Sequence, residues 1–263
     1  MLHLNCKDNR LYYKLAGFAR TLLNKYVFID QKKKRTGEDV FLKDLLDNLM
    51  IDPVLRERVD RILTVGNEDP RLHVLPRDER ALPGDESFKR SGWWKYMLTR
   101  YALATYHSKG KCVLDSCSGL GWGSYLVDAV ADLVLAVDID KPTVELARSL
   151  WPTRVTEWIQ GSVLELGFAS NSIDVGLAME GIEHFTLVNI HRYLDEIYRV
   201  IRPGGELIGS SSFPETREQA DALCAENPYH LYICTRGELI SMLEKRFSLY
   251  YIYQNGLFFW AQK

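Results

Sequence analysis

The sequence predicts an α/β protein with a mostly parallel sheet, covered by helices on both faces and closed by an antiparallel hairpin. Three observations predict this fold. Short apolar runs alternate with helical patterns from residue 111 onward, as in parallel sheets with helical crossovers. The first run opens into a glycine-rich turn at residues 119–123. Near its end the chain has two β-rich runs around Asn255-Gly256, a dipeptide typical of hairpins.

Within residues 111–262 the pattern predicts seven strands and four helices. The strands are expected at 111–115, 133–138, 155–160, 173–179, 206–211, 248–253 and 257–262, and the helices at 123–131, 142–151, 188–201 and 236–247.

Residues 1–90 do not follow this alternation. Apolar residues recur at helical spacing over 10–28, 40–50 and 53–63, and a looser stretch follows at 66–87. We therefore expect a helical N-terminal appendage and connector over 1–90, and a second domain over 91–263 that begins with a helix at 93–107. The appendage offers a surface through which a homodimer could form.

Composition sets outer bounds on the function. The 263 residues suffice for one large α/β domain with an appendage, and 46% hydrophobic and 26% charged residues are usual for a soluble globular protein. A net charge of −2 gives no general basic character, so we expect no nucleic-acid partner. The five cysteines form no Cys-x-x-Cys pair, and we find neither a signal peptide nor a long apolar span. We therefore expect a cytoplasmic protein without a membrane partner.

The glycine-rich turn is the strongest functional signal. Residues 113–124 read Val-Leu-Asp-Ser-Cys-Ser-Gly-Leu-Gly-Trp-Gly-Ser, the pattern of a strand, a tight turn and a helix N-terminus that begins a nucleotide-binding unit. Gly119 and Gly121 let the backbone turn sharply and approach a ligand. Asp115, just before the turn, would repel a diphosphate. The sequence therefore favours a cofactor with ammonium and sulfonium charges over a nicotinamide dinucleotide.

A second acidic signal follows at the end of the next strand. Asp138 ends the apolar run 133–138, a position from which a carboxylate accepts the hydroxyls of a ribose. Asp140 is expected to cap the helix that begins at Lys141-Pro142.

With these motifs, residues 100–205 resemble the class I S-adenosylmethionine-dependent methyltransferases, of the type that acts on small molecules in sugar pathways. Four segments follow the order of that family: 113–124, 136–139, 171–185 and 199–205. The resemblance implies a Rossmann-like sheet and S-adenosylmethionine as cofactor. The residues that it implies as cofactor-binding are Asp115, Ser116, Gly119, Gly121, Trp122, Asp138, Ile139, Ser162, Val163 and Glu180. Ser162 stands where the family commonly has an acid, and its hydroxyl can still accept a hydrogen bond from the adenine amine.

Methyl transfer from a sulfonium depends mainly on holding the nucleophile in line with the methyl group. A hydroxyl nucleophile also needs a base, and His184 follows the fourth predicted strand, where similar enzymes face the methyl group. Glu183 and His230 are the other candidate catalytic residues. For each histidine a purely structural role stays open at this point, since either side chain could simply close or fill its loop.

Glu180, Glu183 and His184 also have a spacing that could suit a metal ion. Their spacing resembles the Glu-x-x-Glu-His motif that binds a metal in some small-RNA and quinone-precursor methyltransferases. The same letters occur in relatives without a metal, and no further histidine stands close by, since position 187 is a leucine. We therefore expect no metal.

The leading functional interpretation is methyl transfer to a small molecule. Residues 77–101 resemble the leader segments of enzymes from surface-polysaccharide and sugar-nucleotide pathways, which favours a sugar hydroxyl as acceptor. The alternatives are a nucleic-acid or protein methyltransferase and a non-catalytic cofactor-binding partner subunit. A nicotinamide dehydrogenase is disfavoured because the turn is Gly-x-Gly-x-Gly rather than Gly-x-Gly-x-x-Gly.

Overall fold

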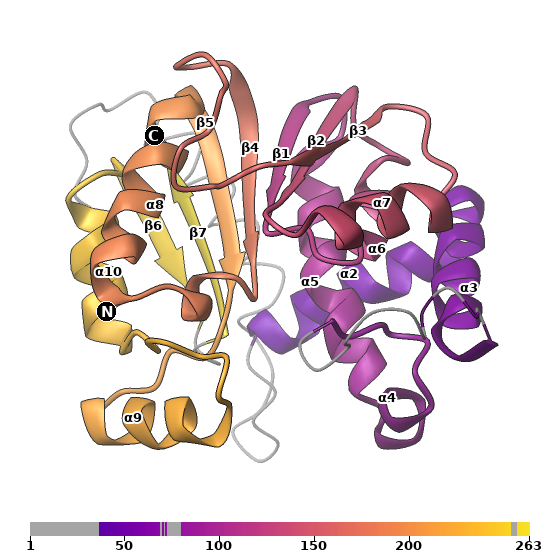
Figure 1. Cartoon of the computed structure of the whole chain (residues 1–263), viewed down its shortest axis with the longest axis horizontal. Helices are drawn as coiled ribbons and strands as arrows, with labels where there is room; N and C mark the ends of the chain where they lie inside the picture. Colours follow the sequence, from indigo (N-terminus) through magenta and orange to yellow (C-terminus); the bar gives the residue numbers. More distant parts are fainter. Residues whose placement is uncertain (1–36, 69, 71, 73–79, 254–256) are drawn as a thin grey trace.

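A computed structural model of the chain describes residues 37–68, 70, 72, 80–253 and 257–263. Its centre is a seven-stranded sheet in the order β3-β2-β1-β4-β5-β7-β6 (Figure 1). Strands β1 to β5 pair in parallel, and β7 runs antiparallel to both β5 and β6. The predicted fold class and its closing hairpin are therefore confirmed, although the Asn255-Gly256 turn lies outside the described residues.

The observed strands lie close to the predicted ones. They are β1 (Cys112–Ser116), β2 (Leu133–Asp138), β3 (Thr156–Gln160), β4 (Ile173–Met179), β5 (Ile201–Ser210), β6 (Leu249–Ile252) and β7 (Phe258–Gln262). The exception is β5, which begins five residues earlier than predicted, at Ile201 instead of Glu206. Ile201 pairs with Ile173 but Glu206 pairs with Val175, so the residues between them form an irregularity in the ladder.

Helices cover both faces of the sheet. Two separate groups of buried apolar side chains show this: α5, α6 and α7 contribute to one, and α8 and α10 to the other. Helix α9 was not predicted, although Thr216 and Gln219 form a capping box at its start. The helices of this part are α5 (Trp93–Ser108), α6 (Trp122–Val127), α7 (Lys141–Leu150), η2 (Ile182–His184), α8 (Leu187–Val200), α9 (Arg217–Glu226) and α10 (Arg236–Glu244).

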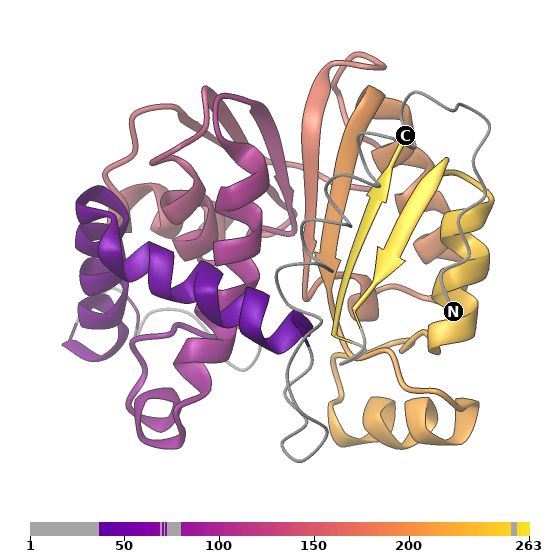
Figure 2. The same ribbon diagram turned by 180° about the vertical axis from the view of Figure 1, so that it is seen from behind.

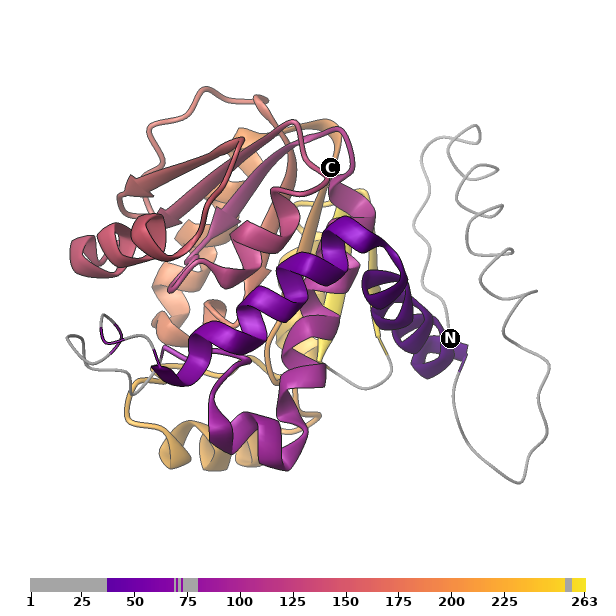
Figure 3. The same ribbon diagram turned by 90° about the vertical axis from the view of Figure 1, so that its right-hand side faces the viewer.

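The N-terminal helices share the core of the α/β part. Helices α2 (Gly37–Ile51) and α3 (Pro53–Glu68) pack on α5 and α6, on the face opposite to α8 (Figures 2 and 3). Arg58 of α3 forms a buried ion pair with Asp128, at 2.8 Å. The helix predicted at 10–28 lies outside the described residues. Among the helices that the structure describes, none is long and apolar enough to cross a membrane.

The carboxyl ends of the parallel strands form the edge at which the site is expected. Arrows β4 and β5 point toward the end of the molecule where α4 (Glu86–Ser91) and α9 lie (Figure 1). In open α/β sheets, ligands bind outside this edge because the loops that follow the strands gather there.

At the opposite end of the sheet, the carboxylate of Glu206 joins three elements. It accepts hydrogen bonds from Lys111 at 2.7 Å and from the indole of Trp260 at 3.1 Å, and it pairs with His107 of α5 at 3.2 Å. Burial alone would raise the pKa of Glu206. The contacts with His107 and Lys111 outweigh burial and lower the pKa to about 2.

Glu206→Gln should therefore lower the free energy of unfolding at pH 7 by about 2–3 kcal/mol, because a carboxyl with a depressed pKa stabilises the folded state only when it is ionised. The difference between wild type and variant should shrink as the pH falls from about 5 toward 2. Urea unfolding across this pH range measures it. Glu145→Gln, in the exposed Lys141–Glu145 pair, is the control and should change stability little. A pH-independent loss in Glu206→Gln would contradict the assignment.

Candidate active site

The glycine-rich turn between β1 and α6 has the backbone that the sequence predicted. Gly119 and Gly121 have φ values of +53° and +72°, in the left-handed region that favours glycine. A Cβ atom on Gly119 would meet nothing within 4 Å, whereas one on Gly121 would lie 2.3 Å from the Trp158 ring. Gly119 therefore faces open space that a ligand can occupy, and Gly121 is required for close packing beneath the turn.

Cys117 joins this turn to the loop after β4. Its φ of +58° is unusual for a residue with a side chain. A Cβ atom placed on Gly181 would lie 3.0 Å from the Cβ of Cys117, so the two loops are in close contact. Burial raises the pKa of the Cys117 thiol well above its usual range, which agrees with a packing role instead of a nucleophilic one.

Asp115 lies in the buried part of β1, just before the turn. Its side chain is fully buried; its carboxylate accepts a hydrogen bond of 2.6 Å from Ser124 and longer ones of 3.3 Å from Tyr101. Burial raises the pKa of Asp115 to about 7, against the opposing effect of these hydrogen bonds. The contact of this carboxylate with the cofactor stays a prediction.

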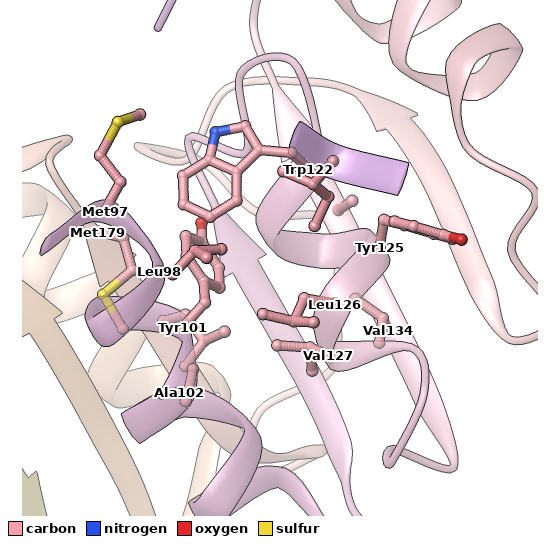
Figure 4. Packing of buried hydrophobic residues seen from close by; sticks show 14 of the residues in the cluster. Met97, Leu98, Tyr101, Ala102, Trp122, Tyr125, Leu126, Val127, Val134 and Met179 are labelled. Carbon is pink, nitrogen blue, oxygen red and sulfur yellow. The ribbon is translucent and has the colours of Figure 1, made fainter. Parts of the chain in front are cut away.

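Tyr101 and Trp122 make a small aromatic wall next to this carboxyl. Their ring centroids are 4.7 Å apart, and Figure 4 shows the two side chains facing each other. Gly123 is needed here, because a Cβ atom at that position would lie 1.9 Å from the Tyr101 ring. The hydroxyl of Ser116, by contrast, points away, to the Leu177 carbonyl and the Tyr193 hydroxyl at 2.5 Å each. A cofactor contact of Ser116 stays a prediction, and its backbone is the part of the residue that these hydrogen bonds leave unused.

The end of β2 meets the turn through Asp138. One carboxylate oxygen accepts the backbone N–H of Gly119 at 2.8 Å, and the other accepts that of Asp140 at 3.0 Å. Each oxygen retains a second lone pair with which it can accept a ligand hydroxyl. Asp140 caps α7 as predicted, since its side chain accepts from the Thr143 N–H. Ile139, between the two acids, is 70% exposed and can cover a ligand at this strand end.

The segment after β3 lies against the same strand end. The backbone N–H of Gly161 donates to the carbonyl of Asp138 at 2.9 Å, which places Ser162 and Val163 next to β2. The Ser162 hydroxyl accepts a local hydrogen bond from the Leu164 N–H at 3.2 Å, and Val163 is buried.

Beyond β4, Glu180 forms an ion pair that the sequence did not predict. Its φ is +51°, and its carboxylate lies 3.1 Å from the guanidinium of Arg100, which comes from α5. Arg100 also stacks over the Tyr96 ring at 4.5 Å. Tyr96 and Arg100 are four residues apart on α5 and therefore lie on one face of the helix. The sequence could have indicated this contact, but it does not indicate the ion pair with Glu180.

The three candidate catalytic residues meet at one place. Among the described residues, Glu183, His184 and His230 form a cluster whose carboxylate and ring nitrogen atoms lie within 4.8 Å of one another. The two imidazole rings are 5.3 Å apart and nearly perpendicular. All three residues were predicted as catalytic candidates from the sequence, but their contact was not. Glu183 and His184 follow β4, whereas His230 comes from the segment between α9 and α10.

Backbone hydrogen bonds hold this cluster together. The N–H groups of Leu231 and Tyr232 donate to the carbonyl of Glu183, at 2.9 and 3.3 Å. The Cys224 thiol donates to the carbonyl of His230 at 3.1 Å. The residues that follow His230 are thus bonded to Glu183, which directly precedes His184, and these bonds hold the two histidines close together.

Glu183 is a strongly perturbed acid at this edge. Its residue is only 3% exposed, and burial raises its pKa to about 8, with a further contribution from Glu180. The Arg100 charge opposes this shift only in part. A strongly perturbed carboxyl at the carboxyl edge of an α/β sheet is typical of a functional site.

Comparisons with known proteins agree with this geometry. Residues 114–209 match the family model described as a methyltransferase domain. The chain is 29% identical over 188 residues to a probable S-adenosylmethionine-dependent methyltransferase of Mycolicibacterium smegmatis, covering 68% of each chain. It is 28% identical over 132 residues to a demethylmenaquinone methyltransferase of Oceanobacillus iheyensis, covering 46% of this chain and 52% of that protein. The structure of the Bacillus subtilis YcgJ protein shares the fold, with a TM-score of 0.53 and 20% identity, over 59% of this chain and 70% of that one.

The chain belongs to the class I S-adenosylmethionine-dependent methyltransferases. In this methyltransferase the open space above Gly119, the carboxylate of Asp138 and exposed Ile139 lie along one edge. An adenosyl group fits this arrangement, because a ribose finds carboxylate acceptors and an apolar side chain adjoins them.

The left-handed turn generates a direct test in the methyltransferase. Gly121→Ala should weaken binding of S-adenosylhomocysteine by about tenfold or more, because the added methyl group forces Trp158 or the turn to move. Isothermal titration calorimetry measures the affinity. Gly110→Ala is the matched control: its φ is +66°, and its Cβ atom would meet nothing within 4 Å. Both variants should lose stability, but equal cofactor affinity in the two would show that the turn does not bind the cofactor.

Proposed function

We propose that this methyltransferase transfers a methyl group to a hydroxyl of a small-molecule acceptor, foremost a sugar or related metabolite. The observation that carries the proposal is the meeting of Glu183, His184 and His230 at the edge of the sheet where the cofactor turn lies. These side chains offer carboxylate and imidazole lone pairs, which are the groups that accept the proton of a hydroxyl nucleophile.

The contact between the two loops supports this arrangement. Cys117 of the cofactor turn packs on Gly181, two residues before Glu183, so the predicted cofactor site and the cluster adjoin. When bound, S-adenosylmethionine supplies an electrophilic methyl group on a good leaving group. The chain then needs chiefly to hold the acceptor hydroxyl in line with that methyl and to receive its proton.

The rim of the cluster supports a sugar acceptor. Tyr229 and Trp93 are 46% and 47% exposed, an unusual exposure for large aromatic side chains. Tyr229 directly precedes His230, and its carbonyl lies 3.2 Å from His184 Nδ1. The centroid of the Trp93 ring lies 4.5 Å from that of the Tyr96 ring in a tilted arrangement, and Tyr96 contacts Arg100. Aromatic faces pack on the C–H groups of a sugar ring, while charged and amide groups bind its hydroxyls.

The acceptor class can be tested by product mass. The enzyme should be incubated with S-adenosylmethionine and separate sets of sugar nucleotides, free sugars, a demethylated quinone, a fatty acid and an RNA oligonucleotide. We expect a sugar-containing product that is heavier by one methyl group, with the methyl located on a hydroxyl oxygen by fragmentation. Methylation of the quinone, fatty acid or RNA with every sugar unchanged would contradict the proposed acceptor.

The role of Asp138 in holding the cofactor gives a second test. Asp138→Ala removes the carboxylate expected to accept the ribose hydroxyls, and should weaken cofactor binding by about 1.5–3 kcal/mol. Calorimetric titration with S-adenosylhomocysteine measures this loss. Asp132→Ala, an exposed position just before β2, serves as the control and should leave the affinity unchanged. Equal affinities in the two variants would remove Asp138 from the site.

A further inference from the structure

On the basis of the proposed function, we further propose that Glu183, His184 and His230 together bind a divalent transition-metal ion. The acceptor hydroxyl would dock beside this ion. The sequence disfavours a metal because the same letters occur in relatives without one and because no further histidine follows His184 closely in the chain. In the folded chain His230 supplies a second imidazole from a different segment.

The geometry of the cluster is close to that of a metal site. The three ligand atoms lie within 4.8 Å of one another. Ligands at about 2.0–2.2 Å from a metal are separated from each other by at most roughly 4.4 Å. The upper bound on the separations in the cluster exceeds this value by about 0.4 Å, so we expect all three atoms to reach one ion after a modest adjustment of the side chains.

One carboxyl oxygen of Glu183 has room for a further partner. The Oε2 atom is buried, and among the described residues no hydrogen-bond donor reaches it, although Ser211 hydrogen-bonds to the carboxyl group. The nearby carboxylate of Glu180 is paired with Arg100. A metal ion at the cluster would give Glu183 Oε2 the partner that the described residues do not supply.

Neighbouring groups also hold the two imidazole rings. His184 Nδ1 lies 3.2 Å from the carbonyl of Tyr229; donation of its proton there puts the lone pair of the ring on Nε2. His230 Nε2 lies 3.0 Å from the side-chain amide of Asn227. Metal-binding histidines are characteristically oriented by such hydrogen bonds from the other ring nitrogen or from flanking groups.

The donor set indicates which ions fit. Two imidazoles and one carboxylate suit zinc, cobalt, iron or nickel better than magnesium, which prefers oxygen ligands. A bound ion of this kind would supply Lewis acidity and would lower the pKa of a hydroxyl held beside it. In the overall transfer the sulfonium S–CH3 bond breaks as the C–O bond forms, S-adenosylhomocysteine leaves, and the hydroxyl proton passes to solvent. In the absence of a metal, the same residues could accept that proton directly, which makes direct binding measurements necessary.

The test measures metal binding apart from catalysis. Untagged protein, treated with a chelator and dialysed, is titrated with cobalt(II) chloride by calorimetry and by visible absorption, and with magnesium chloride for comparison. Glu183→Gln and His230→Asn remove one ligand each. His191→Asn, on α8 and outside the cluster, is the matched control that leaves the other histidines in place. Binding of S-adenosylhomocysteine is measured on every variant to establish that it is folded.

We expect one cobalt ion per chain, an absorption spectrum with nitrogen-ligated cobalt bands, and at least about tenfold weaker binding in Glu183→Gln and His230→Asn but not in His191→Asn. Absence of stoichiometric cobalt binding, or equal losses in His191→Asn and His230→Asn, would overturn the inference. Methyl transfer that persists in excess chelator, with no cobalt bound, would reject the metal and leave the proposed function intact. Cobalt binding without any cofactor binding would support the metal site and reject the proposed function.

Discussion

The hydrogen bonds from Leu231 and Tyr232 to the carbonyl of Glu183 are the constraint on which the candidate active site depends. They tie the segment before α10 to the short helix after β4. Together with the contact of His184 Nδ1 with the Tyr229 carbonyl, they hold His230 beside His184, although no strand pairing joins the two loops directly. The sheet brings both loops to its carboxyl edge, and these bonds set the final few ångströms. Catalytic groups need positioning of this kind, because small displacements cost large factors in rate.

Burial then determines the character of the charged groups at this edge. Asp115 and Glu183 are both nearly inaccessible to water, and burial raises the pKa of each, to about 7 and about 8. Both oxygens of Asp115 accept hydrogen bonds from Tyr101, and one also accepts a hydrogen bond from Ser124. Glu183 lacks an equivalent set of donors on Oε2 among the described residues. The two buried acids therefore differ in how far the surrounding side chains satisfy their oxygens.

Local sequence patterns predicted most of the fold and the positions of the site residues. The strands, the left-handed glycines and the cap at Asp140 each depend on nearby residues, and they are observed, with β5 starting earlier than predicted. The contact of His184 with His230 could not be predicted, because it depends on how two loops pack across the end of the sheet. The Arg100–Glu180 pair was missed for the same reason. The burial of Asp115 was missed because it depends on Tyr101, which reaches it from another helix.

The central claim is that cofactor and cluster share one edge, with the transferred methyl group facing Glu183, His184 and His230. A crystal structure of the complex with S-adenosylhomocysteine tests it most directly. The account predicts ribose hydroxyls on Asp138 and the sulfur atom on the side of the cluster, within reach of an acceptor bound there. A ligand whose sulfur points away from these three residues, or which binds at another edge of the sheet, would contradict the account.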